Sequence, residues 1–317
     1  MSAFSLFTSI CPPKNPDALS YLRECLGSWK TAGFDIVAVN GPAECAAMEP
    51  LKLPVMWHRL PCDGKPLIGN ILAAIRCRPV GFAGIINADC QLIAYPDLAE
   101  NLARNLSGRA AFAHRFDSDN GALKPMLWGF DAFFFDTALL PSSDLGFAIG
   151  DPWWDIWFPM SFEIAGVPIE TIDTPLVIHR IHPIRWNWLR WIANGNQFWA
   201  WLQEHKTTPL FGKIEPAWWE QRRLSREQLG EVNRMIVAWL RDHRPQTEIS
   251  VMPAAMGTVE SMLRLGGRAT VETAYTRQIE KELDAIKRST FWRATGPFRT
   301  TVTVFRKIST AARGAVA

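Results

Sequence analysis

The chain has 317 residues, of which 48% are hydrophobic and 21% charged, and its net charge is +3. This composition is typical of a globular protein, so it excludes wholesale disorder, and the small charge argues against binding of nucleic acid along the whole chain. The six cysteines are scattered and form no CxxC pair, which favours reduced thiols over a disulfide scaffold or a zinc ribbon. The first residues lack the basic start of a signal peptide and no apolar run could span a membrane, so a cytoplasmic protein is expected.

Apolar runs alternate with helical patterns over the first ninety residues. The predicted strands of this half are residues 4–10, 34–39, 54–59 and 81–86. Apolar residues at helical spacing predict one helix between Asn15 and Gly33 and another over 66–77. This order predicts an α/β fold of the Rossmann type, in which a mixed, mostly parallel sheet is flanked by helices. Such sheets bind ligands at the carboxyl ends of their strands.

The second half of the chain is less regular and contains most of the tryptophans. Four further strands are predicted, at residues 110–116, 127–135, 167–172 and 175–179. A helix is predicted over 151–166, and helices are predicted within 186–243 and over 258–289. Of the 15 tryptophans, 11 lie between Trp153 and Trp239. A cluster within this stretch lies beside several arginines, which favours an interface over a core or a platform for stacking sugars; its members are Trp186, Trp188, Trp191, Trp199, Trp201, Trp218 and Trp219.

Asp89 is the sharpest candidate for chemistry, because it follows the apolar run at 81–86 and has Asn87 two residues before it. Oxygen ligands at a strand end can hold Mg2+ or Mn2+ against a diphosphate, although a turn residue that caps the strand is the alternative. His179 and His182 follow another predicted strand, where an imidazole could add a nitrogen ligand. Residues three apart on an extended segment point to opposite faces, so the two histidines are not expected to share one site.

Asp151 and Asp155 lie four residues apart at the start of a predicted helix and so share a face. One of them could be the general base that removes a proton from an attacking hydroxyl. The alternative is a carboxylate that stabilises the helix dipole, which suits Asp151 better than Asp155. Lys65 follows Gly64 and could reach a phosphate, or it could be a solvated loop lysine. The sequence contains no GxxxxGK[ST], GxGxxG or GxSxG motif.

Taken in order, these segments resemble GT-A-type glycosyltransferases, the large inverting family of nucleotide-sugar enzymes that assemble polysaccharides, here of the bacterial surface-polysaccharide type. The resemblance covers about residues 4–185 and rests on FSLFTSI at 4–10, FDIVAVNG at 34–41, Gly64-Lys65-Pro66 with Asn70, FAGIINAD at 82–89, and the segment 150–183. In that alignment Asn87 stands where the family's DxD-type motif has its first acid, which leaves Asp89 as the main metal carboxylate.

The resemblance implies a GT-A-like nucleotide-sugar-binding catalytic domain over 1–185. Its implied nucleotide-sugar contacts are Thr8, Ser9, Asn40, Lys65, Asn70, Asn87 and Asp89. Its implied metal ligands are Asp89 and His182, with Mn2+ or Mg2+ as the cofactor, and its implied base is Asp155 or Asp151. These residues would transfer a sugar, as in a hexosyltransferase, from a nucleotide diphosphate to a hydroxyl of a saccharide or lipid-linked acceptor.

Two further segments are expected after the catalytic domain, a Trp-rich helical extension at 186–250 and an amphipathic helix with a basic tail at 251–317. The tail has aromatic and basic residues and no acid after Asp284, a composition typical of segments that bind a membrane surface. We therefore expect a peripheral protein on the inner face of the membrane, with no nucleic-acid partner.

Two alternatives to the transferase remain open. A sugar-nucleotide nucleotidyltransferase would use a similar sheet, but the first predicted strand is not followed by a Gly-rich basic loop. A non-catalytic, membrane-associated scaffold with a decayed site would suit Asn40 and Asn87, which stand in place of acids.

Overall fold

The computed structural model describes residues 4–242, except 94, 96, 120–121, 143, 183–186 and 206–211. The chain divides into two compact units, Met1–Leu265 and Gly266–Ala317, and every described residue falls in the first. The predicted helix at 258–289, the basic tail and Trp186 lie outside the described residues.

Helices and strands alternate along the chain. The elements are β1 (Phe4–Thr8), α1 (Pro16–Thr31), β2 (Asp35–Asn40), α2 (Pro42–Met48), η1 (Glu49–Leu51), β3 (Met56–Arg59), α3 (Ile68–Arg76), β4 (Phe82–Ile86), β5 (Cys90–Leu92), α4 (Leu98–Asn105), β6 (Ala110–Asp119), β7 (Ala122–Asp136), η2 (Thr137–Leu139), α5 (Trp154–Ile164), β8 (Ile169–Arg180), α6 (Trp188–Glu204), η4 (Pro216–Trp218) and α7 (Arg226–Asp242). The two strands predicted at 167–172 and 175–179 are one continuous strand, β8, which corrects that prediction.

The described strands form one mixed sheet in the order β3-β2-β1-β4-β7-β6-β8-β5. The first four of these strands are parallel to one another. β7 runs antiparallel to β4 and β6, whereas β8 is parallel to β6 and antiparallel to β5. The predicted α/β fold with a mixed sheet flanked by helices is confirmed.

The sheet curls, because β4 and β5 are joined by only three residues and yet lie four places apart in the strand order. Four steps across a flat sheet would span about 19 Å. The backbone from Ile86 to Cys90 reaches at most about 14 Å. Register shifts near Ala113 and His114 mark bulges in β6, and bulges bend and twist a strand. The curl returns the far edge of the sheet to the end of β4, where Cys90 pairs with His179.

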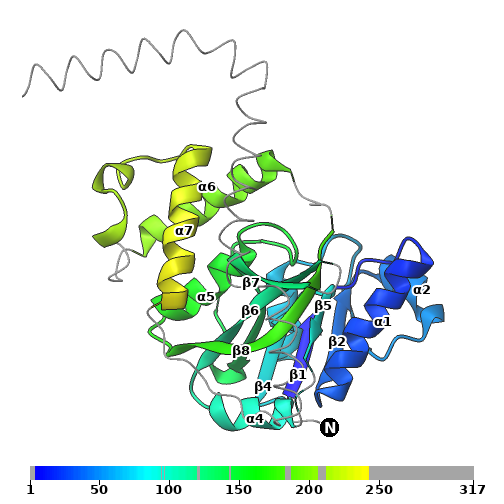
Figure 1. Ribbon diagram of the computed structural model, residues 1–317. Helices are drawn as coiled ribbons and strands as arrows, with labels where there is room; N and C mark the ends of the chain where they lie inside the picture. Colours follow the sequence, from blue (N-terminus) through cyan, green and yellow to red (C-terminus); the bar gives the residue numbers. More distant parts are fainter. Residues whose placement is uncertain are drawn as a thin grey trace, which may run out of the picture. The chain divides into compact units, whose positions relative to one another are not determined.

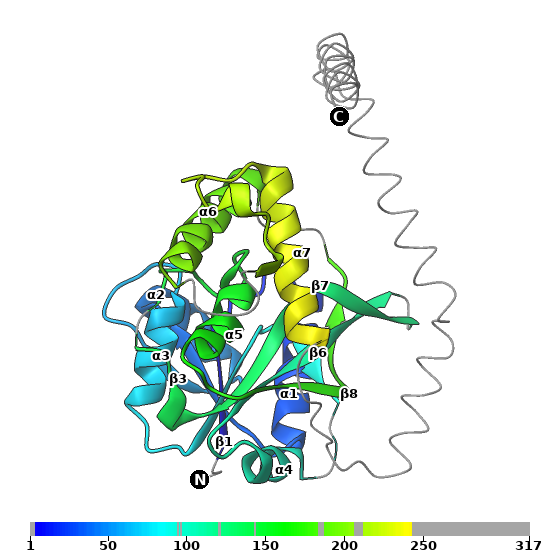
Figure 2. The same cartoon turned by 90° about the vertical axis from the view of Figure 1, so that its left-hand side faces the viewer.

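Helices cover both faces of the sheet (Figures 1 and 2). One core lies between the sheet and α3, α5, α6 and α7, and the other between the sheet and α1 and α4. Side chains of a strand alternate between its faces, so Phe7 of β1 belongs to the first core while Phe4 and Leu6 belong to the second. Burial on both faces explains why these strands appear in the sequence as continuous apolar runs.

The described tryptophans of the second half pack mainly against the core, which corrects the predicted interface for most of the cluster. Their large rings fill the space between α5, α6 and α7 and pack against one another, as Trp199 and Trp219 do with ring centres 4.7 Å apart. The most buried are Trp153, Trp154, Trp157 and Trp199, and those partly buried against the same core are Trp191, Trp201, Trp218, Trp219 and Trp239. Trp188 is 47% exposed and has the guanidinium of Arg226 over its ring.

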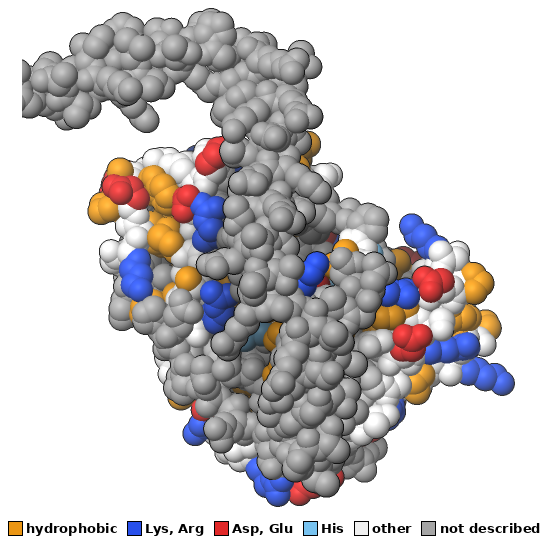
Figure 3. Space-filling model, viewed as in Figure 1, with side chains coloured by type: hydrophobic (Ala, Val, Ile, Leu, Met, Phe, Trp, Pro, Cys, Tyr) orange, Lys and Arg blue, Asp and Glu red, His pale blue; other side chains and the backbone are white. Residues whose placement is uncertain are grey.

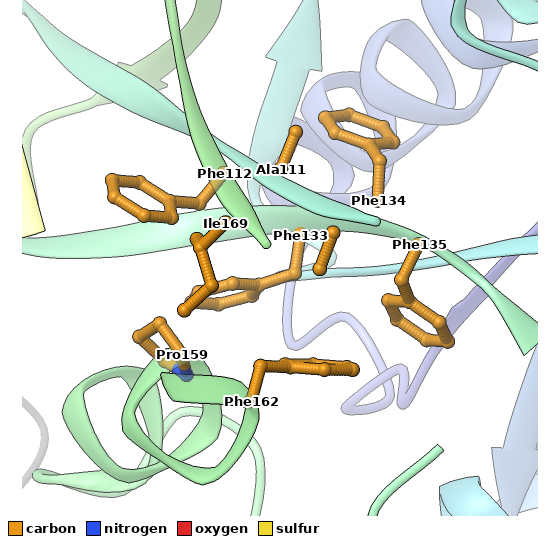
Figure 4. Close-up of a pocket in the computed structure, with 9 residues that line it drawn as sticks. Ala111, Phe112, Phe133, Phe134, Phe135, Pro159, Phe162 and Ile169 are labelled. Carbon is orange, nitrogen blue, oxygen red and sulfur yellow. The ribbon is translucent and has the colours of Figure 1, made fainter. Parts of the chain in front are cut away.

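An apolar crevice lies between α5 and the sheet (Figure 4). Phe112 and Phe133 come from the sheet, and Pro159 and Phe162 come from the facing side of α5. The crevice has no space for a water molecule, so we regard it as imperfect packing beside the proline of α5. None of the described helices is long and apolar enough to cross a bilayer.

Candidate metal centre

Asp89, His179 and His182 come together at the carboxyl end of β4. The Nε2 atom of His182 lies 3.0 Å from Oδ2 of Asp89, and Nε2 of His179 lies 3.9 Å from the same oxygen. The two imidazole rings are 4.9 Å apart between centres. One ligand atom from each residue lies within 4.8 Å of the other two. Two ligand atoms bound at about 2.1 Å to one ion are about 3 to 4 Å apart. Both distances to Oδ2 of Asp89 lie in that range, so these residues could hold a metal ion.

Both histidines face Asp89, which corrects the expectation that they could not share one site. His179 is within β8 and its side chain is buried, whereas β8 ends at Arg180 and His182 lies beyond it. The alternation of side chains therefore stops applying between them. His179 reaches Asp89 because the curl of the sheet pairs it with Cys90, the next residue along the chain.

Asp117 of β6 forms a hydrogen bond with His179 at the ring nitrogen that does not face Asp89. The Oδ1 atom of Asp117 lies 3.0 Å from Nδ1 of His179. A carboxylate at Nδ1 favours the tautomer in which Nε2 carries the lone pair, which here faces Asp89. Burial acts to raise the pKa of Asp117, but the hydrogen bond with His179 and the charge of Arg115 outweigh it and hold that pKa below its ordinary value. Asp117 therefore remains a carboxylate.

A buried ion-pair network continues from Asp117 along the sheet. Arg115 pairs with Asp117 at 3.0 Å and with Asp131 of β7 at 2.6 Å. The side-chain amide of Asn87 donates to Asp131, and the backbone N–H of Asn87 donates to the carbonyl of Asp131 at 3.1 Å. Asn87 therefore holds the start of the Asp89 loop against β7. Whether it also contacts a sugar nucleotide stays a prediction.

Asp155 lies in the first turn of α5 and keeps only part of its surface in solvent. Burial, together with the negative charge of Asp131, raises the pKa of Asp155 to about 7. Hydrogen bonds from backbone N–H groups, including that of Phe130, act in the opposite direction and are too weak to cancel these effects. A carboxyl group with such a pKa can accept a proton near neutral pH.

Asp151 has different surroundings from Asp155. Its buried carboxylate forms ion pairs with Lys65 and Arg190, whose own side chains are half exposed. Asp151 thus ties the loop before α3 to the start of α6, and each of its two carboxylate oxygens is paired with a cation. Of the two predicted bases, Asp155 has the environment that suits the role.

The polar residues at the ends of β1 and β2 are drawn together by Asn40. Its side chain is fully buried, accepts from the N–H of Ile10 at 3.1 Å and donates to the carbonyl of Ile10 at 2.9 Å. It also donates to Ser9 and, at 2.6 Å, to Glu44 of α2. Asn40 therefore braces the loop after β1. The hydroxyl of Thr8 is buried and has no hydrogen-bond partner among the described residues. Direct nucleotide contacts by these residues stay a prediction.

Asn70 is occupied at the start of α3. Its Oδ1 atom accepts from the backbone N–H of Leu67 at 2.9 Å and so stabilises the first turn of the helix. The structure does not bring its side chain into the Asp89 network, and its predicted role in sugar-nucleotide binding remains untested.

Four residues around the centre were not predicted from the sequence: Arg115, Asp117, Asp131 and Tyr21. Asp131 carried a signal, because it is the one charged residue in the apolar run LWGFDAFFF at 127–135. A buried charge is retained only where it is paired, so such a residue predicts a partner. Asp117 and Arg115 gave no comparable signal, since they lie in the polar half of β6.

Comparisons with known proteins give similarity in structure alone. No protein-family model and no curated protein sequence matches the chain. The chain is similar to TarS of S. aureus with 14% identity and a TM-score of 0.44, covering 76% of this chain and 72% of that one. A longer TarS structure matches at 13% identity and a TM-score of 0.40, over 75% of this chain and 52% of TarS, so the chain spans about half the length of that relative. A protein from Desulfovibrio desulfuricans G20 described as a nucleotide-diphospho-sugar transferase matches at 12% identity and a TM-score of 0.40, over 78% of this chain and 100% of that one.

Proposed function

We propose that the protein is a metal-dependent glycosyltransferase that moves a sugar from a nucleotide diphosphate to a hydroxyl group, with inversion at the anomeric carbon. The observation that carries this proposal is the meeting of Asp89, His179 and His182 at the carboxyl end of β4. Ligands of open α/β sheets bind outside the carboxyl ends of strands. The order of motifs that resembles GT-A-type transferases supports the same assignment.

The donor set favours Mn2+ over Mg2+. Imidazole nitrogens suit transition metals, whereas Mg2+ prefers oxygen ligands and keeps much of its water. Two of the three candidate ligands are imidazoles, because His179 joins His182 at the site. A divalent ion here would neutralise charge that develops on the leaving diphosphate.

Asp155 is our candidate for the general base. The acceptor hydroxyl must lose one proton as it attacks the sugar. The carboxylate of Asp155 can accept this proton at neutral pH, because the pKa of Asp155 is about 7. Asp131 contributes by its charge, which makes Asp155 more basic. Arg115 limits this effect, since it neutralises part of the charge of Asp131.

We further propose that the acceptor is a saccharide or a lipid-linked saccharide used in surface-polysaccharide synthesis, and that the basic tail at 286–317 brings the enzyme to the inner face of the membrane. The composition of the tail supports this proposal. On the face of the first unit drawn in Figure 3, acidic and basic side chains are interspersed on the right-hand side.

The first experiment is a thermal-shift titration of the full chain with UDP, GDP, CDP, CMP and ADP, each with and without Mn2+. A ligand at 100 times its Kd stabilises the folded state by about 2.7 kcal/mol, which is readily measured. We expect one nucleotide to raise the midpoint only when Mn2+ is present. Absence of any shift in folded protein would contradict the transferase and favour a non-catalytic scaffold.

Matched variants locate the effect. Asp89→Asn should abolish the Mn2+-dependent shift and sugar transfer while the protein stays folded. Asp35→Asn is the control, because Asp35 begins β2 at the opposite end of the parallel strands and pairs with Lys30 on the surface. Retained transfer in Asp89→Asn would refute the assignment of the metal centre.

A further inference from the structure

Tyr21 of α1 lies between the two chain segments that supply the candidate ligands. Its hydroxyl donates to the backbone carbonyl of Asp89 at 3.0 Å. The same hydroxyl accepts from the backbone N–H of Arg180 at 2.8 Å, and Arg180 lies between His179 and His182 in the chain. One oxygen atom thus joins the Asp89 loop to the end of β8.

The side chain of Arg180 packs over the ring of Tyr21. Its guanidinium lies 4.0 Å from the centre of the Tyr21 ring, a cation–π contact. It also pairs with Asp17, one turn earlier in α1, at 3.2 Å. The ring of Tyr21 is therefore fixed between α1 and Arg180, which limits the positions that its hydroxyl can take.

Two neighbouring residues of α1 anchor the segment that follows Asp89. The indole N–H of Trp29 donates to the carbonyl of Cys90 at 2.9 Å. The hydroxyl of Ser28 accepts from the N–H of Leu92 at 2.9 Å. Helix α1 is thus fastened to the backbone of 89–92 along its length, and Tyr21 alone among these three side chains also reaches β8.

We propose that Tyr21 is a positioning residue for the metal centre. The hydroxyl of Tyr21 keeps the Asp89 carboxylate and the two histidines at the separation that a bound ion requires. This proposal rests on the metal centre of the proposed function. Tyr21 touches neither the ion nor the substrate; it acts through the two backbones. Ligand orientation by such outer contacts typically changes metal affinity 10- to 100-fold.

The test is the affinity of the full chain for Mn2+ alone, measured by isothermal titration calorimetry. Tyr21→Phe keeps the ring and removes the bridging oxygen, and we expect Mn2+ binding about tenfold weaker. Tyr95→Phe is the matched control, because Tyr95 is also buried and its hydroxyl donates to the carbonyl of Pro175 in the same strand β8 at 2.7 Å. Tyr95→Phe should lower the unfolding midpoint without changing the affinity for Mn2+.

Each outcome separates the positioning role from the metal centre itself. Equal Mn2+ affinity in Tyr21→Phe and the unaltered chain would overturn the positioning role and leave the centre intact. Failure of the unaltered chain to bind Mn2+ would overturn both. If Tyr21→Phe does not fold, Arg180→Gln releases the ring from outside while the backbone N–H remains, and a two- to fivefold weaker affinity is expected; an unchanged affinity there would also overturn the proposal.

Discussion

Replacing Asp155 with Asn should stabilise the protein at pH 8 while it removes sugar transfer. The pKa of Asp155 is raised from 3.8 to about 7. A carboxyl whose pKa is higher in the folded state binds its proton more tightly there than in the unfolded chain. The free energy of unfolding therefore falls as pH rises from about 4 to about 7 and is constant above that range.

The size of the effect follows from the shift. Each pKa unit corresponds to about 1.4 kcal/mol, so the charged form costs at most about 4 kcal/mol in the folded state at pH 8. Asp155 keeps some contact with solvent, which reduces this cost. We therefore expect Asp155→Asn to raise the free energy of unfolding at pH 8 by about 2 kcal/mol. For a chain of this size that gain raises the unfolding midpoint by about 5 °C. At pH 4 the carboxyl is protonated, and the two proteins should be nearly equal in stability.

Thermal unfolding of both proteins between pH 4 and pH 8 is the assay, with sugar transfer measured in parallel. The rate of the unaltered chain should rise as Asp155 loses its proton near pH 7 and should be nearly absent in Asp155→Asn. A stability difference that does not change with pH, or a variant less stable at pH 8, would refute the reasoning. Full activity in the variant would remove Asp155 as the base.

Three other substitutions separate roles at the centre from roles in the fold. Asp117→Asn should weaken Mn2+ binding at least tenfold in calorimetry, because His179 loses the carboxylate that orients it; unchanged affinity would contradict this. Asp151→Asn should keep transfer within about threefold and cost about 1 kcal/mol in urea denaturation, since its two cationic partners are half exposed and can be hydrated; loss of transfer would instead favour Asp151 as the base. Gly84→Ala should lower the free energy of unfolding by about 1 to 3 kcal/mol, because a Cβ there would lie 2.5 Å from Leu6 and 2.8 Å from the backbone carbonyl of Phe133. An equally stable variant would show that β4 can move away from its neighbours β1 and β7 at no cost.

The sequence was sufficient to predict the parallel half of the sheet, chiefly because β1, β2 and β4 are apolar runs that end at or just before polar residues. It was insufficient for β5, whose three residues are too short to show any periodicity. The helices α2 and α4 were also missed, and α2 begins at Pro42, only two residues after β2 ends at Asn40. Patterns of a few residues do not distinguish a short helix from a turn.

The candidate site was predicted in part for the same reason. Asp89 and His182 could be found because each follows an apolar run at a strand end. That His179 supplies a second imidazole to the same site could not be predicted, because its position depends on bulges in β6 and on the curl of the sheet. Both are properties of strand pairing, and a single sequence does not encode them in its local pattern.

The curl of the sheet has a consequence for how the protein reaches its folded state. Asp89 and the two histidines are separated by about ninety residues of chain, so an ion can join them only after β5 has paired with β8. Mn2+ added to the folded protein should then slow amide hydrogen exchange chiefly in β5 and at the end of β8, while the four parallel strands exchange at nearly the same rate as before. The ion would link the loop before β5 to the end of β8, so its removal should weaken the pairing of these two strands.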